Sequence, residues 1–79
     1  MLISHERLAQ LKEQQDYLEQ AYEFAFNRNT VRLGKQGAKA ELINELAIAE
    51  TEAEFKAAGL DIATNRIRLE IDFLTDYFS

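Results

Sequence analysis

Apolar residues recur at alternating intervals of three and four positions near the start of the chain. This spacing places them along one face of a helix, as in the seam of a coiled coil. Just before the series, Ser4 is a good N-cap residue, and Glu6 suits the first helical turn. The pattern predicts a long helix over residues 4–27. Its seam comprises Leu8, Leu11, Gln15, Leu18, Tyr22 and Ala25, of which five are apolar.

A second helix, over residues 38–58, is predicted by a face built mostly of alanine, with Gly59 placed as its C′ glycine. The face is flat, so we expect it to pack closely on the first helix. Residues 28–37 contain weak helix formers and two glycines, and we expect a basic connecting loop there. An alternative boundary carries the first helix to Leu33, with Gly34 as its C′ residue. The alanine-rich face comprises Leu42, Leu46, Ala49, Ala53 and Ala57.

The third segment, residues 61–78, fits two patterns. As a helix it has a regular apolar face and a second apolar strip, which indicates burial on both sides or contact with a second chain. Residues 66–73 also alternate apolar and charged side chains, as a strand does. A strand would need a partner, and only residues 30–33 offer one, so we prefer the helix and keep an α+β fold as the alternative. The two helical strips comprise Ile67, Ile71, Leu74 and Phe78, and Ile62, Leu69, Phe73 and Tyr77.

Length and composition agree with one small helical domain. The 79 residues allow a single domain, residues 1–79. The chain has no proline, no cysteine and three glycines, so few positions interrupt a helix and disulfides are excluded. We therefore predict an all-α fold, in which the first two helices form an antiparallel hairpin and the third packs across them.

The predicted helices carry more apolar surface than a three-helix monomer can bury. Tyr17 and Phe24 lie seven residues apart and point away from the seam, and Ile48 and Phe55 point away from the alanine-rich face. We interpret such side chains as an interface, and expect a homo-oligomer, most simply a C2 homodimer. The predicted interface comprises Tyr17, Ala21, Phe24, Ile48, Phe55, Leu69, Phe73 and Tyr77.

The second helix also carries a ridge of acids. Glu41, Glu45 and Glu52 flank Ile48 and Phe55. An apolar centre with an acidic rim is a plausible docking site for a basic protein surface. The alternative is a solvated face with no partner.

Basic residues are concentrated in the predicted loop, although the net charge of the chain is −5. Such a cluster is a candidate for phosphate contacts with nucleic acid. The acidic balance of the whole chain argues against that use, and cations also suit the C-terminal end of the first helix. The candidate phosphate contacts are Arg28, Arg32, Lys35 and Lys39.

No set of residues indicates catalysis or metal binding. His5 is the one histidine, and without cysteine it cannot form the usual zinc site. The serines and threonines have no evident triad partners. There is no apolar run of about 18 residues and no signal-peptide pattern, and the lack of cysteine favours a cytoplasmic setting. We expect no enzymatic activity, no cofactor, no metal and no membrane contact.

The sequence thus favours a non-enzymatic protein–protein interaction module, a small acidic adaptor, regulator or inhibitor that acts by covering a surface. One version is an inhibitor of the kind that phages and mobile elements encode, which blocks a basic, nucleic-acid-binding surface of a host protein. Two alternatives stay open: a nucleic-acid accessory domain that uses the basic segment, and a structural subunit of a larger assembly.

Overall fold

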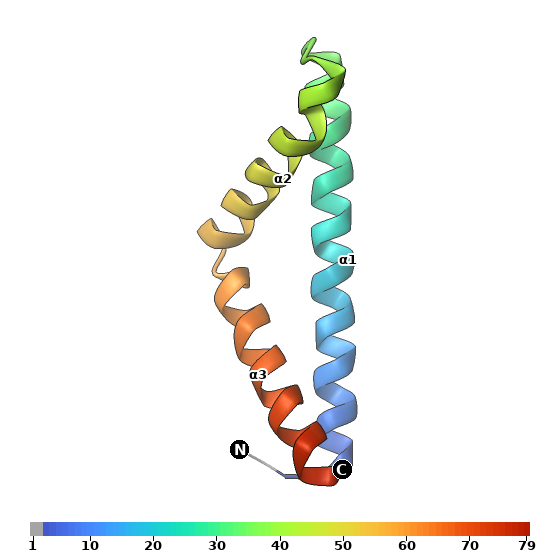
Figure 1. Cartoon of the computed structure of the whole chain (residues 1–79), viewed down its shortest axis with the longest axis vertical. Helices are drawn as coiled ribbons and strands as arrows, with labels where there is room; N and C mark the ends of the chain where they lie inside the picture. Colours follow the sequence, from blue (N-terminus) through green and yellow to red (C-terminus); the bar gives the residue numbers. More distant parts are fainter. Residues whose placement is uncertain (1–2) are drawn as a thin grey trace.

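Three α-helices make up residues 3–79, the part of the chain that the computed structural model describes (Figure 1). They are α1 (His5–Lys35), α2 (Ala40–Ala57) and α3 (Leu60–Phe78), and no strand occurs among the described residues. The predicted all-α fold is confirmed. The alternative of a strand over residues 66–73 is wrong, since those residues lie in the middle of α3.

The start of α1 follows the sequence prediction. The Oγ atom of Ser4 accepts a hydrogen bond of 3.0 Å from the backbone N–H of Arg7, as an N-cap should. Within the predicted seam Leu11 and Ala25 are buried, and its other members are half-buried. The seam is therefore the face that α1 turns toward the rest of the molecule.

The end of α1 lies well beyond residue 27, so the predicted loop over residues 28–37 is wrong. The helix continues to Lys35, because Asn29 and Leu33 extend the seam and are both buried. Their packing outweighs the weak helix propensity of this stretch. The residue with a left-handed conformation is Gly37, with φ of 82°, rather than Gly34. The helix therefore ends two residues later than even the alternative boundary allowed.

The α2 helix turns the opposite face inward from the one the sequence suggested. Ala47 and Thr51 are fully buried, whereas Leu42 and Leu46 of the alanine-rich face are exposed. Hydrogen bonds between buried polar side chains hold this inward face against α1. Asn29 donates a hydrogen bond to the Thr51 hydroxyl over 3.1 Å, and that hydroxyl donates to the Ala47 carbonyl over 2.7 Å.

The aromatic ring of Phe55, on the inner side of α2, stabilises the same orientation of this helix. The Phe55 ring lies edge-on to the Tyr22 ring of α1, with ring centroids 5.3 Å apart. Aromatic pairs of this geometry contribute roughly 0.5–1.5 kcal/mol beyond the area they bury. The face with larger side chains and a matched polar pair thus packs inward, and the alanine face is left outside.

The α3 helix begins directly after a turn at Gly59, which has φ of 74° and ends α2 as predicted. Its inner face forms the main apolar core with the first part of α1. Leu11, Ile71 and Leu74 are buried together, and the partly buried Leu8, Ile67 and Phe78 pack against them. The ion pair between Arg7 and Glu70, 2.8 Å long, joins the same two helices.

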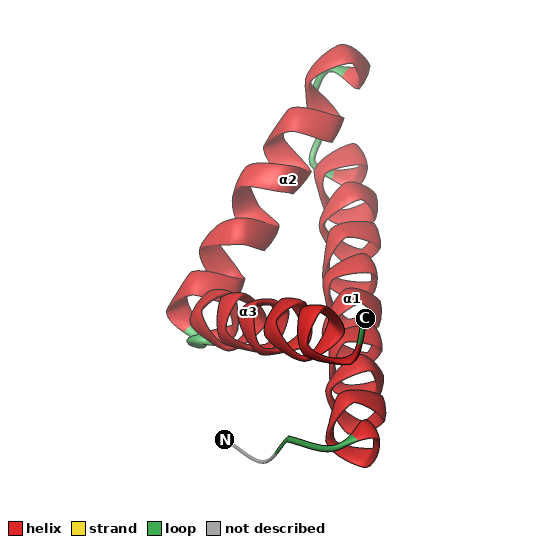
Figure 2. Cartoon of the chain, turned by 60° about the horizontal axis from the view of Figure 1, so that its bottom comes forward, coloured by secondary structure: helices red, strands yellow, loops and turns green. Residues whose placement is uncertain are grey.

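The helices are arranged as one long rod with two shorter rods laid end to end beside it (Figure 1). The α2 helix follows the C-terminal half of α1 and α3 follows its N-terminal half, so α3 does not cross the hairpin as expected. The turned view shows the elbow between α2 and α3 standing away from α1 (Figure 2). The molecule measures 50 × 18 × 16 Å. Across the described residues, no helix is both long and apolar enough to cross a membrane.

Candidate functional site

Many large apolar side chains stay exposed, although the fully buried core is small. Six apolar residues among those described are buried, and most of them are small or belong to the α1–α3 core. Ten large apolar side chains lie exposed on the described residues. They are Ile3, Tyr17, Phe24, Val31, Leu42, Leu46, Ile62, Leu69, Phe73 and Tyr77.

The accessible area gives the same result for the whole molecule. A compact protein of 9.1 kDa is expected to expose about 4,900 Å², whereas this chain exposes 5831 Å². The radius of gyration is 16.1 Å, against about 12 Å for a compact chain of this length. The excess area of about 900 Å² is similar to the roughly 800 Å² that each partner buries in a standard protein interface.

The outer side of α1 carries an apolar stripe, as predicted. Tyr17 and Phe24 are 63% and 70% exposed, and Ala21 between them is exposed as well. At 3.6 residues per turn, Phe24 lies roughly 140° around the helix from Leu11. The stripe also includes Val31, which is 57% exposed. Sequence reasoning missed Val31 because it placed this residue in a loop. We call these four residues the α1 outer stripe.

The predicted interface residues of α2 lie nearer to α1 than expected. Ile48 and Phe55 are half-buried, and Phe55 packs on Tyr22, so their part in an interface stays a prediction. The exposed apolar side of this helix is the alanine-rich face that was expected to pack inward. We call it the α2 outer stripe, and it comprises Leu42, Leu46, Ala49 and Ala53.

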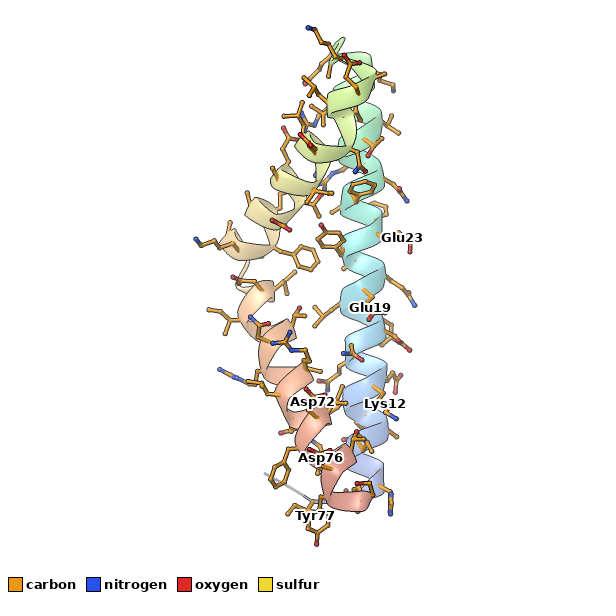
Figure 3. All side chains as sticks on the ribbon, viewed as in Figure 1. Lys12, Glu19, Glu23, Asp72, Asp76 and Tyr77 are labelled. Atoms are coloured by element: carbon orange, nitrogen blue, oxygen red, sulfur yellow. The ribbon has the colours of Figure 1, made fainter. Side chains whose placement is uncertain are left out.

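The second apolar strip of α3 is exposed over its whole length. Leu69, Phe73 and Tyr77, all predicted as interface residues, lie on it together with Ile62. Figure 3 shows Tyr77 at the foot of the molecule, with its hydroxyl pointing away from the other helices. Of the two readings of this strip, burial within the chain is wrong, and contact with another chain stays a prediction.

The acidic residues of α2 lie on the surface beside Ile48. Glu41, Glu45 and Glu52 are all exposed, and none of them forms an ion pair with another described residue. Acids on α1 are similarly exposed, and Glu23 points outward from α1 in Figure 3. These carboxylates contribute an acidic surface next to a partly apolar one.

The candidate phosphate contacts are not brought together as a basic patch. Arg28 forms an ion pair with Glu54 and Arg32 forms one with Glu50, so α2 neutralises both cations. Lys35 and Lys39 are exposed at the α1–α2 connection. The arginines act as part of the α1–α2 contact.

A buried amide connects these ion pairs. Asn29 is almost fully buried, donates to Thr51 and, over 3.2 Å, to the carboxylate of Glu54, and accepts from Arg32 over 3.3 Å. Hydrogen bonds from Arg28 first, and then from Asn29, lower the pKa of Glu54. We call Arg28, Asn29, Arg32, Glu50, Thr51 and Glu54 the polar cluster. It fixes the register between α1 and α2.

A cleft of about 550 Å³ lies where α2 and α3 meet beside the middle of α1. Leu18, Tyr22 and Phe55 contribute apolar lining, and Glu52 and Arg68 contribute charges of opposite sign. The mixed lining gives no preference for a ligand of one charge.

The histidine and the acids of the described residues are dispersed over the molecule. Within residues 3–79, no three side chains of the ligand-forming types come together in a way that could hold a metal ion. The His5 ring stacks on the Phe78 ring at a centroid distance of 3.8 Å. This contact gives His5 a packing role at the end of the α1–α3 core.

Comparison with protein families, with curated proteins and with solved structures finds no match for this chain. Function is therefore inferred from the surfaces of the molecule alone.

Proposed function

We propose that this chain is a non-enzymatic protein–protein interaction module that works as a homo-oligomer and covers part of another protein's surface. The observation that carries the proposal is the set of ten large apolar side chains that lie exposed on the described residues. Contiguous exposed apolar surface is typical of protein interfaces, and aromatic side chains such as Phe24 and Phe73 are typical of their energetic centres.

The acidic surface would make the protein selective for basic partners. Glu41, Glu45 and Glu52 are exposed and make no ion pair within the described residues. Acids of this kind favour encounter with a basic surface and disfavour acidic partners. A partner with a basic, nucleic-acid-binding surface fits these charges. Nucleic acid itself fits them poorly, since Arg28 and Arg32 already have acidic partners.

Mass in solution tests the proposal. Light scattering over a concentration series should give a multiple of the 9.1 kDa chain mass. A mass of one chain at every concentration up to the millimolar range would refute the homo-oligomer. A fixed particle of many subunits would instead support the structural-subunit alternative. The charge-reversed triple variant at Glu41, Glu45 and Glu52 should keep its mass but lose binding to a basic protein surface.

A further inference from the structure

We infer that the α1 outer stripe is the self-association surface, and that two copies of the chain pair through it with their α1 helices antiparallel. This inference rests on the proposed homo-oligomer and specifies its geometry. The stripe runs along the longest helix, whose 31 residues extend about 46 Å. Neither α2 nor α3 covers this side of α1, and it is the apolar one of the uncovered sides.

The charges beside the stripe favour the antiparallel direction. Glu6 and Glu13 lie on this side in the N-terminal half of α1, and Lys35 lies on it in the C-terminal half, all exposed. None of these three residues forms an ion pair with another described residue. Parallel helices would bring like charges together, whereas antiparallel helices bring opposite charges together.

One register pairs the aromatic and the charged positions together, and it places Val31 opposite the second copy's Gln10. When the two-fold axis passes between Gln20 and Ala21, Tyr17 of each chain lies opposite Phe24 of the other. In the same register Glu6 lies opposite the second copy's Lys35. Glu13 lies opposite the second copy's Arg28, which Glu54 already neutralises, so the pair of Glu6 and Lys35 carries the charge preference. The small Ala21 at the centre allows the two helices to approach closely.

The size of the excess surface agrees with a pair of this kind. The chain exposes about 900 Å² more than a compact protein of its mass, and a stable interface needs about 800 Å² from each partner. Two aromatic pairs, related by the two-fold axis, supply anchors at the centre of the contact.

Cysteine cross-linking tests the direction and the register, since the natural chain has no cysteine. Ala21→Cys should form a disulfide-linked dimer on mild oxidation, because the two copies of this residue lie next to the axis. Val31→Cys alone should not, because its two copies lie roughly 30 Å apart along antiparallel helices. A mixture of Gln10→Cys and Val31→Cys chains should form the mixed dimer. Leu46→Cys, on the α2 outer stripe, is the matched control. After oxidation it should form no covalent dimer, so it should migrate as a single chain when it is denatured without a reducing agent.

Each outcome is decisive. Efficient self-cross-linking of Val31→Cys would show parallel helices and overturn the inference, while the homo-oligomer would stand. Cross-linking of Leu46→Cys in place of Ala21→Cys would move the interface to α2 and overturn it as well. A chain that is monomeric by light scattering would overturn both the inference and the proposed homo-oligomer.

Charge reversal gives an independent measurement. Glu6→Lys and Lys35→Glu should each raise the dimer dissociation constant about five- to twenty-fold, because each reversal acts twice by symmetry. The double variant restores opposite charges and should return to within about two-fold of the natural chain. Both reversals weaken the ends of α1, so recovery in the double variant cannot come from helix stability. Additive weakening in the double variant would contradict the antiparallel pairing.

Discussion

The orientation of α2 can be tested with one chemical change placed at two neighbouring positions. Ala47 is 0% exposed, whereas Ala49 is exposed on the opposite side of the same helix. Replacing either residue by leucine adds three carbon atoms and hardly alters helix propensity. The two variants therefore differ mainly in the space available for the new side chain.

The structure predicts very different stabilities for the two variants. At Ala47 the added atoms must push α1 and α2 apart, which costs roughly 1–3 kcal/mol in an overpacked site. At Ala49 they enter solvent, and the change should stay within about 0.5 kcal/mol. A domain of this length has a total stability of roughly 4–12 kcal/mol, so Ala47→Leu removes a substantial part of it. Its melting temperature should fall by roughly 5–20 °C.

Thermal and urea unfolding, followed by circular dichroism, measure both effects. The natural chain, Ala47→Leu and Ala49→Leu are compared at equal concentration, with the helix signal of each folded variant as a check on the fold. The reasoning is refuted if Ala49→Leu is the more destabilising of the two. That result would mean that the alanine-rich face packs on α1, as the apolar pattern first suggested.

Three further predictions follow from single positions. Leu74→Ala should lower the free energy of unfolding by about 2–5 kcal/mol because Leu74 is fully buried, whereas Leu69→Ala, at 63% exposure, should cost less than about 1 kcal/mol in urea unfolding. Gly34→Ala should stabilise helix α1 by about 0.5–1 kcal/mol, whereas Gly59→Ala should destabilise the protein by about 1–2 kcal/mol because φ at Gly59 is 74°. The melting temperature should therefore rise in the first variant and fall in the second. Because the pKa of Glu54 is lowered in the folded state, its contribution to stability is full above the unfolded value of 4.5 and is lost as the pH falls through the folded value. In Glu54→Gln the free energy of unfolding should therefore fall less steeply as the pH is lowered. The same acid dependence in this variant and the natural chain would count against the role of Glu54.

Much of the fold could be predicted because the inward faces of α1 and α3 carry the most regular apolar spacing on their helices. The seam from Leu8 to Ala25 repeats regularly, and the main core residues Leu11, Ile71 and Leu74 all lie on faces identified from the sequence. Local signals also sufficed at Ser4 and at Gly59, where a cap and a left-handed residue fix the element ends.

The α2 orientation could not be predicted from apolar spacing, because its inward face is centred on Ala47 and Thr51 and not on a regular series of large apolar residues. The deciding contact is the hydrogen bond between Asn29 and Thr51, which are 22 residues apart in sequence. The low helix propensity of Asn29 predicts a loop at this position, and this prediction hides its role as a continuation of the seam. A polar residue at a seam position, with a matching hydroxyl on the next helix, was the signal that could have found both errors.

The inferred dimer also determines which surfaces stay available for a different protein. In it α1 has α2 and α3 on one side and the second copy's α1 on another, so the paired α1 helices form the centre of the assembly. The α2 outer stripe and the second apolar strip of α3 then lie away from the two-fold axis, still exposed, together with the ridge of Glu41, Glu45 and Glu52. In the inferred dimer, self-association and the proposed partner binding therefore use separate faces, and the dimer would present two copies of the proposed partner-binding face. Two linked copies raise the effective concentration for a second contact, so a partner with repeated basic surfaces should bind the dimer more tightly than a single chain binds one such surface.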